Sequence, residues 1–224
     1  MACHYRLLDQ LDPSIRERLL EGHREIHVDD SYQLLFQSDW GDEAYIVSAG
    51  ILKARRYNIH GEEVVIALMG VGALIGELAL LSTEPIRTVD VVALTPVKLL
   101  KLRKNALQRE MEESPALMKA IAVLQSQRLL ALGDRLMLMN EDATTRLLAT
   151  LLHLALLNGA EPSPTNEIPS LLQQEIATLA GLSRSTVSTL INKMMDNGTL
   201  VKSATSMAFA STDPLTKRGL LADA

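Results

Sequence analysis

The density of turn-forming residues changes near Arg103, and this change limits the folds that the chain can adopt. Before it, short segments rich in Val, Ile, Leu and Tyr are separated by turn formers, a pattern typical of a β-roll, sandwich or jelly roll. After it helical periodicity takes over, and between Pro115 and Asn140 there is no further proline and only one glycine, Gly133. The expected class is therefore α+β, with strands over 25–28, 34–36, 44–48, 51–57, 63–69, 87–93 and 97–102.

A long helix is expected to follow this β-region. Ser114 and Pro115 match a helix N-cap and a proline at the first helical position, and no further proline occurs before Asn140. At 1.5 Å per residue, such a helix of about 25 residues is a rod about 38 Å long. Apolar residues recur along it in steps of three and four, first at Leu117, Ile121 and Leu124 and later at Leu129, Leu132, Leu136 and Met139.

Two interpretations of this helix remain open. A rod longer than one small β-roll can form a coiled-coil-like seam with a second copy of the chain. Alternatively, it is an amphipathic helix that packs on its own domain. Its pattern breaks at 140–142, where we expect a hinge. The predicted domains are residues 1–113, a helix and hinge over 114–141, and residues 142–224.

The segment from Gln173 to Asn192 has the pattern of a helix-turn-helix. Ala177 is small where two helices would cross, and Gly181 stands where the tight turn needs a positive φ. Ser183 is expected to cap the second helix. Ile176, Ala180, Leu182, Val187 and Leu190 are expected to point inward. A generic helical hairpin would not require all these features together.

The second helix of this pair would act as the recognition helix for duplex DNA, because its N-terminal residues would meet base edges and phosphates. A two-strand wing is expected over 200–202 and 207–209. The predicted DNA-binding residues are Gln174, Ser183, Arg184, Ser185, Thr186, Ser188, Thr189, Lys193 and Lys202.

Net charge at first argues against nucleic acid, because the 224 residues carry −5 at neutral pH. Most of the acidity precedes residue 142. From Asp142 to the end there are six basic and seven acidic residues, which predicts a weak, salt-dependent electrostatic attraction to DNA. Aromatic residues are only 3% of the chain, which disfavours stacking on single strands.

Composition also excludes several kinds of site. One cysteine, Cys3, cannot form an intrachain disulfide or a cysteine-built metal cluster. His23 and His27 are interpreted as surface histidines, and no metal site is expected. No segment has the length of a membrane span and the first residues do not form a signal peptide, so we expect a cytoplasmic protein without a membrane partner. No catalytic constellation is recognisable, so we expect no enzyme and no catalytic cofactor.

A second motif lies inside the expected β-region, over 76–88. A helical turn at Gly76 would direct free N–H groups toward an anion, and Arg87 could bind a phosphate through two hydrogen bonds. Thr88 adds a hydroxyl, and Glu77 could accept from a sugar hydroxyl. Taken alone, one Glu and one Arg eleven positions apart would equally fit an ordinary salt bridge.

Together, the Gly76-Glu77-Leu78 and Arg87-Thr88 cassette, the long helix and the run over 182–187 resemble the Crp/Fnr family of bacterial transcription regulators. The resemblance covers nearly the whole chain. It implies a β-roll that binds a cyclic nucleotide such as cAMP or cGMP, a homodimer formed through the 114–141 helix, and RNA polymerase as a partner. The implied effector-binding residues are Gly76, Glu77, Leu78, Ala79, Arg87, Thr88, Ala131 and Leu132.

The chain departs from the family at the base end of this pocket. In cAMP-responsive members a Thr and a Ser contact the purine, whereas Ala131 and Leu132, or Leu132 and Gly133, occupy the matching positions here. None of these offers a side-chain hydroxyl. A different cyclic nucleotide, a non-nucleotide effector or no effector is therefore an alternative, as is a signalling module whose helical tail binds protein. Effector identity, target promoters and the sign of regulation stay open.

Overall fold

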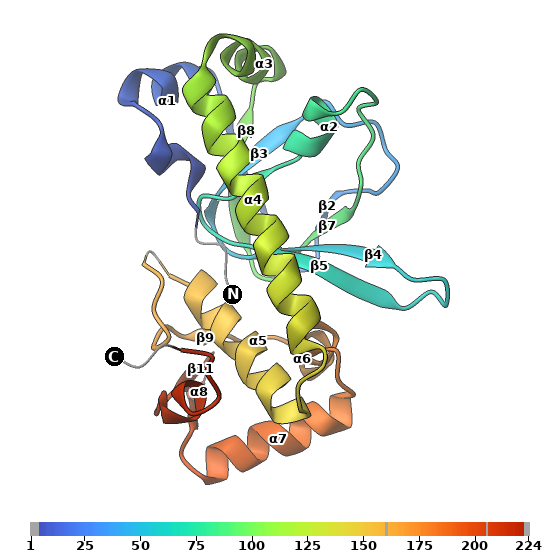
Figure 1. Ribbon diagram of the computed structural model, residues 1–224, viewed down its shortest axis with the longest axis vertical. Coiled ribbons are helices and arrows are strands. Elements are labelled where there is room, and N and C mark those ends of the chain that lie inside the picture. Colours follow the sequence, from blue (N-terminus) through green and yellow to red (C-terminus); the bar gives the residue numbers. More distant parts are fainter. Residues whose placement is uncertain (1–4, 160, 205, 222–224) are drawn as a thin grey trace. The chain divides into compact units, whose positions relative to one another are not determined.

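The computed structural model describes residues 5–159, 161–204 and 206–221 (Figure 1). Contacts divide the chain into two compact units, and the boundary falls between Leu132 and Gly133. The N-terminal unit contains the strands of the β-roll, and the C-terminal unit contains the helix-turn-helix. Cys3 lies outside the described residues.

The structure confirms the expected fold class, with a β-roll followed by a long helix and a winged helix-turn-helix. The N-terminal unit begins with η1 (Leu7–Gln10), α1 (Pro13–Leu19), β1 (Arg24–Val28), β2 (Gln33–Leu35), β3 (Ala44–Ala49), β4 (Leu52–Tyr57), β5 (Glu63–Met69) and β6 (Leu74–Ile75). It continues with α2 (Glu77–Leu81), β7 (Asp90–Ala93), β8 (Val97–Leu102), α3 (Lys104–Glu113) and most of α4 (Pro115–Leu138).

Two antiparallel four-stranded sheets form the roll, in the orders β1-β8-β3-β6 and β2-β7-β4-β5. Alternation along a strand sends successive side chains to opposite faces. Tyr45 and Val47 of β3 therefore enter the core between the sheets, where they meet Leu52, Met69 and other buried residues.

The other face of β3 belongs to a second core. Ala44 and Ile46 lie there, together with buried residues of α1, α3 and the first half of α4. These helices therefore cover the outside of the sheet that contains β3 (Figure 1). Both faces of β3 are buried, which fixes the position of the chain just before it, around Glu43.

Helix α4 has two different halves. Leu117, Ile121 and Leu124 are buried against the β-roll. Leu129 and Leu136 belong to the second run of apolar residues on this helix and are 71% and 59% exposed. The first half thus fits the interpretation of a helix packed on its own domain, and the second half presents an uncovered apolar face.

The C-terminal unit contains α5 (Ala143–Leu157), β9 (Ile168–Pro169), α6 (Gln173–Ala180), α7 (Arg184–Asp196), β10 (Leu200–Lys202), β11 (Ser206–Phe209) and α8 (Asp213–Thr216). Asp142 caps α5 by accepting hydrogen bonds from the N–H groups of Thr144 and Thr145. Arg218 also donates to the Asp142 carboxylate at 2.6 Å, which ties the end of the chain to the start of α5.

Some expected boundaries were wrong. The wing was expected as two strands over 200–202 and 207–209, but Ile168 and Pro169 pair with β11 and extend it to three strands. The strand predicted over 87–93 begins only at Asp90, because the backbone of Arg87 bonds instead to Asp39 and Ser38. Strand β6, η1 and α8 were not predicted; each spans only two to four residues, too short to show periodicity.

Candidate functional site

A cavity of about 360 Å³ lies in the N-terminal unit, between the β-roll and the second half of α4. Its walls are mainly apolar, with Leu35, Ile66 and Met69 among them. The polar groups are few and come from the 76–88 motif and from α4. This combination of an apolar wall and a few placed polar groups is typical of small-molecule sites. The polar lining residues are Glu77, Arg87, Thr88, Gln125 and Arg128.

Arg87 is buried at the wall of this cavity, with 6% of its surface exposed. Its Nη1 donates to the carbonyl of Gly76 at 2.9 Å, and its Nη2 donates to the carbonyl of Glu43 at 2.8 Å. The guanidinium is therefore held in place by the backbone on two sides. A guanidinium has five N–H donors, so three remain for other partners.

Two glycines make room for this guanidinium. A Cβ at Gly41 would lie 2.5 Å from Arg87 Nε, and one at Gly76 would lie 2.6 Å from Arg87 Nη1. Gly76 also has φ of 90°, a left-handed conformation that favours glycine. Gly76 thus serves both the backbone turn that starts α2 and the seat of Arg87.

Glu77 is also buried, with 1% of its surface exposed, and α4 provides its partners. Gln125 donates to Glu77 Oε1 at 2.7 Å, and Arg128 donates to the same oxygen at 2.6 Å. Arg128 also donates to the carbonyl of Leu74. The carboxylate is thus paired with a cation, as a buried charge requires.

The structure brings most of the predicted effector residues to one cavity. Gly76, Leu78, Ala79, Thr88 and Leu132 join Glu77 and Arg87 in its lining. Ala131 does not belong to the lining. Thr88 is exposed, so its hydroxyl is accessible to a ligand.

Sequence reasoning missed Gly41, Gln125 and Arg128. A signal for the last two existed, because they lie four residues after Ile121 and Leu124 and so fall on the buried face of α4. Two polar residues on an otherwise apolar face indicate a polar partner beneath them. Gly41 left no comparable signal. Only the structure shows that the Arg87 side chain occupies the space that a Cβ at position 41 would need.

The helix-turn-helix forms the second candidate site, in the C-terminal unit. Ser183 caps α7, its Oγ accepting from the N–H of Thr186 at 3.1 Å, and Gly181 has φ of 63° at the turn, both as predicted. Ala177 is fully buried where α6 meets α7. Ile176, Ala180 and Val187 are buried, and Leu182 and Leu190 are half-buried.

The predicted DNA-binding residues share one property, which is exposure. Gln174, Ser183, Arg184, Ser185, Thr189, Lys193 and Lys202 are exposed, and Thr186 and Ser188 are half-buried. In the part of the chain that the structure describes, the side chains of Arg184, Lys193 and Lys202 have no hydrogen-bond or ion-pair partner. Their charges are therefore available to an external anion such as a DNA phosphate.

The last turn of α4 belongs to this same unit and contacts α6. Arg135 donates from Nη2 to the carbonyl of Leu179 at 3.0 Å, near the end of α6. Burial lowers the pKa of Arg135 from its ordinary value. The helix that lines the effector cavity therefore continues into a direct contact with the helix-turn-helix.

Neither a metal-binding cluster nor a membrane-spanning helix is found in the described residues. These residues contain no group of three or more His, Cys, Asp or Glu side chains that could hold a metal ion. Within residues 5–159, 161–204 and 206–221, no helix is long and apolar enough to cross a membrane.

Comparisons with known proteins give the class of this chain. Residues 26–114 match the family model of the cyclic nucleotide-binding domain, and residues 145–209 match that of the Crp-like helix-turn-helix domain. These two ranges contain the 76–88 motif and the capped recognition helix. The combination defines a DNA-binding transcription regulator with a cyclic nucleotide-binding domain.

Similar proteins narrow this class to a family. The chain is 31% identical over 166 residues to the cyclic AMP receptor protein of Thermus thermophilus, covering 74% of each protein. It is 24% identical over 210 residues to a CRP-like cAMP-activated global transcriptional regulator of Mycobacterium tuberculosis, covering 93% of each. The solved structure of CLP, a c-di-GMP-responsive regulator of Xanthomonas campestris, has a TM-score of 0.70 at 23% identity, with coverage of 90% and 100%. The chain belongs to the Crp/Fnr family of transcription regulators.

Proposed function

We propose that a small anionic effector, in the first instance cAMP or cGMP, binds in the cavity between the β-roll and α4 and changes the affinity of the protein for duplex DNA. One observation carries the proposal. The Arg87 guanidinium is fixed at the cavity wall by two backbone carbonyls and keeps three N–H donors. The phosphate of a cyclic nucleotide can accept from these donors and from the hydroxyl of Thr88.

The ribose would meet Glu77. Both Gln125 and Arg128 contact its Oε1, which leaves the lone pairs of Oε2 for a sugar hydroxyl. Binding in this way does not require either existing contact to break. Because the partners of Glu77 lie on α4, a ligand at Glu77 also touches the network that fixes this helix.

The end of the cavity where the base would lie does not indicate which base is bound. Leu129 and Leu132 of α4 line it, and neither can hydrogen-bond to a purine edge. One relative is named as a cyclic AMP receptor, and one structural neighbour as c-di-GMP-responsive. Apolar walls accept any flat base, so we propose both nucleotides as first candidates. A non-nucleotide anionic effector, or none, is the alternative.

We also propose that the protein acts as a homodimer through the second half of α4. Leu129, Leu130 and Met137 are between 70% and 72% exposed. An apolar stripe of this kind on a long helix is typical of a coiled-coil seam. A dimer would place two copies of α7 on two half-sites, which offsets the low positive charge of each.

Regulation would follow from population shift. A ligand changes an equilibrium only by its different affinities for two states. We propose that α4 links the states, because Gln125 and Arg128 line the effector cavity while Arg135 contacts Leu179. We propose RNA polymerase as a further partner. We also propose that the protein acts in the cytoplasm, where its DNA target would be. Acting by binding, the protein needs no catalytic cofactor.

Calorimetric titration with cAMP and with cGMP tests the effector. Arg87→Ala should abolish measurable binding, and Thr88→Ala should weaken it about tenfold without disturbing the fold, since Thr88 is exposed. Arg56→Ala is the matched control, because Arg56 is an exposed arginine of the same β-roll. Binding that persists unchanged in the Arg87 variant would refute this site. If neither nucleotide binds the wild type, the nucleotide part of the proposal fails.

A cyclic-nucleotide-binding module whose helical tail binds protein is the second candidate function. The near-neutral charge of residues 142–224 favours it slightly. Retention on duplex DNA that falls steeply with salt would exclude it. Selection of bound sequences from random duplexes, with and without nucleotide, would then identify the half-site.

A further inference from the structure

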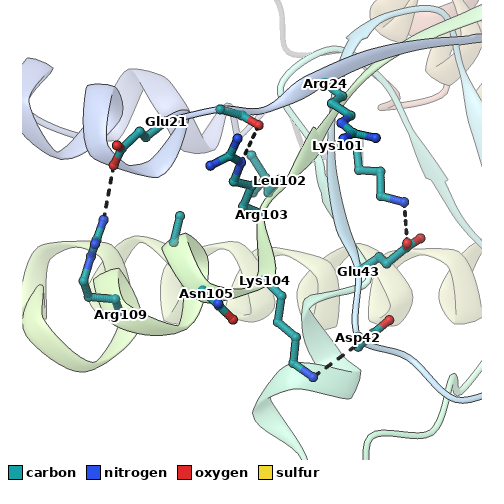
Figure 2. Close-up of a pocket in the computed structure, with 12 residues that line it drawn as sticks. Glu21, Arg24, Asp42, Glu43, Lys101, Leu102, Arg103, Lys104, Asn105 and Arg109 are labelled. Atoms are coloured by element: carbon teal, nitrogen blue, oxygen red, sulfur yellow. Dashed lines mark hydrogen bonds and ion pairs between the residues drawn. The ribbon is translucent and has the colours of Figure 1, made fainter.

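A second pocket of about 540 Å³ lies in the β-roll unit, where the start of β1, the end of β8 and the start of α3 meet (Figure 2). None of its lining residues belongs to the effector cavity. It is lined mainly by charged side chains, in contrast to the apolar effector cavity. The charged lining residues are Glu21, Arg24, Asp42, Glu43, Lys101, Arg103, Lys104 and Arg109.

Positive charge exceeds negative charge in this pocket, with five basic and three acidic side chains. The basic residues come from three elements and converge on one concavity. In a protein of net charge −5 this surplus is a local feature and not a consequence of composition. Such a concavity concentrates anions.

Two of the cations are direct neighbours. Arg24 of β1 pairs with Lys101 of β8 in the antiparallel register. Like charges directly opposite each other on adjacent strands are destabilising unless something neutralises them. Lys101 is neutralised by an ion pair with Glu43, whereas Arg24 has no side-chain partner in the described part of the chain (Figure 2).

The acids in the pocket are already engaged. Glu43 accepts from both Lys101 and Tyr45, and although burial opposes its ionisation, these hydrogen bonds hold its pKa below the ordinary value. Asp42 lies 3.9 Å from Lys104, and Glu21 lies 3.5 Å from Arg109. Neither Arg24 nor Arg103 has an acidic partner in the described part of the chain, and Arg103 is held by the carbonyl of Gly22, so the Arg24 guanidinium remains available to an anion.

Backbone N–H groups add to the positive potential of this pocket. The residues Lys104, Asn105 and Ala106 form the first turn of α3 and line the pocket. Arg103, at the N-cap, makes no side-chain cap, and its own Nε donates to the carbonyl of Gly22 at 2.9 Å. The N–H groups of the first turn have no partner inside the helix.

We propose that this pocket is a second ligand site, which binds a small polyvalent anion carrying phosphate or carboxylate groups. Arg24 offers a bidentate contact to one anionic group, and Lys104 with the first-turn N–H groups of α3 offers contacts to another. The anion supplies the negative charge that Arg24 lacks. The site is independent of the effector cavity and of the nucleotide that is proposed to bind there.

Isothermal titration with inorganic pyrophosphate, in parallel with citrate, tests this proposal on the full-length protein at constant ionic strength. Wild-type protein should show saturable binding, and Arg24→Gln should weaken it about tenfold or more, since a charge-assisted contact is lost. Asp42→Asn removes an exposed acid from the rim and should strengthen binding about threefold. A purely structural role of these residues would not produce opposite effects on affinity.

Lys98→Gln is the matched control. Lys98 is an exposed cation of β8, the strand that pairs with β1, and it does not line the pocket. This substitution should leave pyrophosphate affinity unchanged. The proposal is overturned if neither pyrophosphate nor citrate binds saturably at millimolar concentration, or if Lys98→Gln weakens binding as much as Arg24→Gln. It is also overturned if Thr88→Ala weakens binding as much as Arg24→Gln, because the anion then occupies the effector cavity. Binding of citrate but not pyrophosphate would identify a carboxylate ligand and supports the proposal.

Discussion

The polar side chains of the effector cavity and those of the recognition helix differ in burial and in their hydrogen-bond partners. In the cavity, Arg87 and Glu77 are buried and already bonded to the chain itself. On α7, Arg184 and Lys193 are exposed and have no partner among the described side chains. One site is an internal network that a ligand must join, and the other is an open surface that DNA can cover.

This contrast separates stability from binding. A buried polar group that loses its partner costs the desolvation energy of that group, whereas an exposed group returns to water at little cost. Substitutions in the cavity should therefore lower both stability and effector binding. Substitutions on the recognition helix should change DNA binding alone. Four substitutions, taken in order of their expected effect on stability, test this difference.

Arg128→Met should have the largest effect, about 3 kcal/mol. Removing one partner of a buried ion pair costs about 3–5 kcal/mol, and the partial exposure of Arg128 places it at the lower end. Glu77 would keep only Gln125 as a partner. Urea unfolding of the variant measures the loss. The control is Lys119→Met, an exposed cation on the same helix, which should change stability by less than about 0.5 kcal/mol. An equal loss in both would contradict the contrast.

Arg87→Ala should destabilise the protein by about 2 kcal/mol, because two buried carbonyls, those of Gly76 and Glu43, lose their donor. The unfolding midpoint measures this loss, and the variant should stay folded at low temperature. If its stability equals that of the wild type, the two hydrogen bonds do not hold Arg87 in place. The argument for a fixed phosphate site would then fail.

Ser183→Ala should cost about 1 kcal/mol, since it removes the N-cap of α7. The expected loss of stability is smaller than for the cavity substitutions and larger than for Arg184→Ala. The reason is that Ser183 is exposed but supports the fold of the recognition helix. Ser183→Asp should restore stability, as Asp is an equally good N-cap. Thermal unfolding of the pair distinguishes a cap from a mere surface serine, for which both variants would behave like the wild type.

Arg184→Ala should change stability least, by less than about 0.5 kcal/mol. Its effect should appear on DNA, as a loss of about 1–3 kcal/mol in discrimination at one base position if Arg184 contacts a guanine. Competition binding with duplexes altered at single positions measures this. Equal weakening on all sequences would show a phosphate contact instead.

The sequence predicted the recognition helix better than the cavity. Ser183, Gly181 and Ala177 each act through local geometry, within a few residues, so their roles are visible in the chain itself. The seat of Arg87 depends on Gly41 and on the carbonyl of Glu43, which are 46 and 44 positions away. Such contacts arise only when the sheets form.

The strands and long helices were also predictable, because each is long enough to show its period. The two-residue strand β9 was not, since it exists only by pairing with β11. The exposure of Leu129 and Leu136 could not be distinguished from the burial of Leu124 by spacing alone. Both runs of apolar residues have the same spacing of three and four, and only the extent of the β-roll decides which run is covered.

The most direct test of the whole account is the affinity for a selected DNA duplex, measured by fluorescence anisotropy with and without the cyclic nucleotide that binds the cavity. We predict that saturating nucleotide changes DNA affinity at least about fivefold, the lower range of coupling between linked sites. The nucleotide concentration that produces half of this change should be about tenfold higher in Thr88→Ala. Identical DNA affinity with the cavity empty and filled would contradict the account.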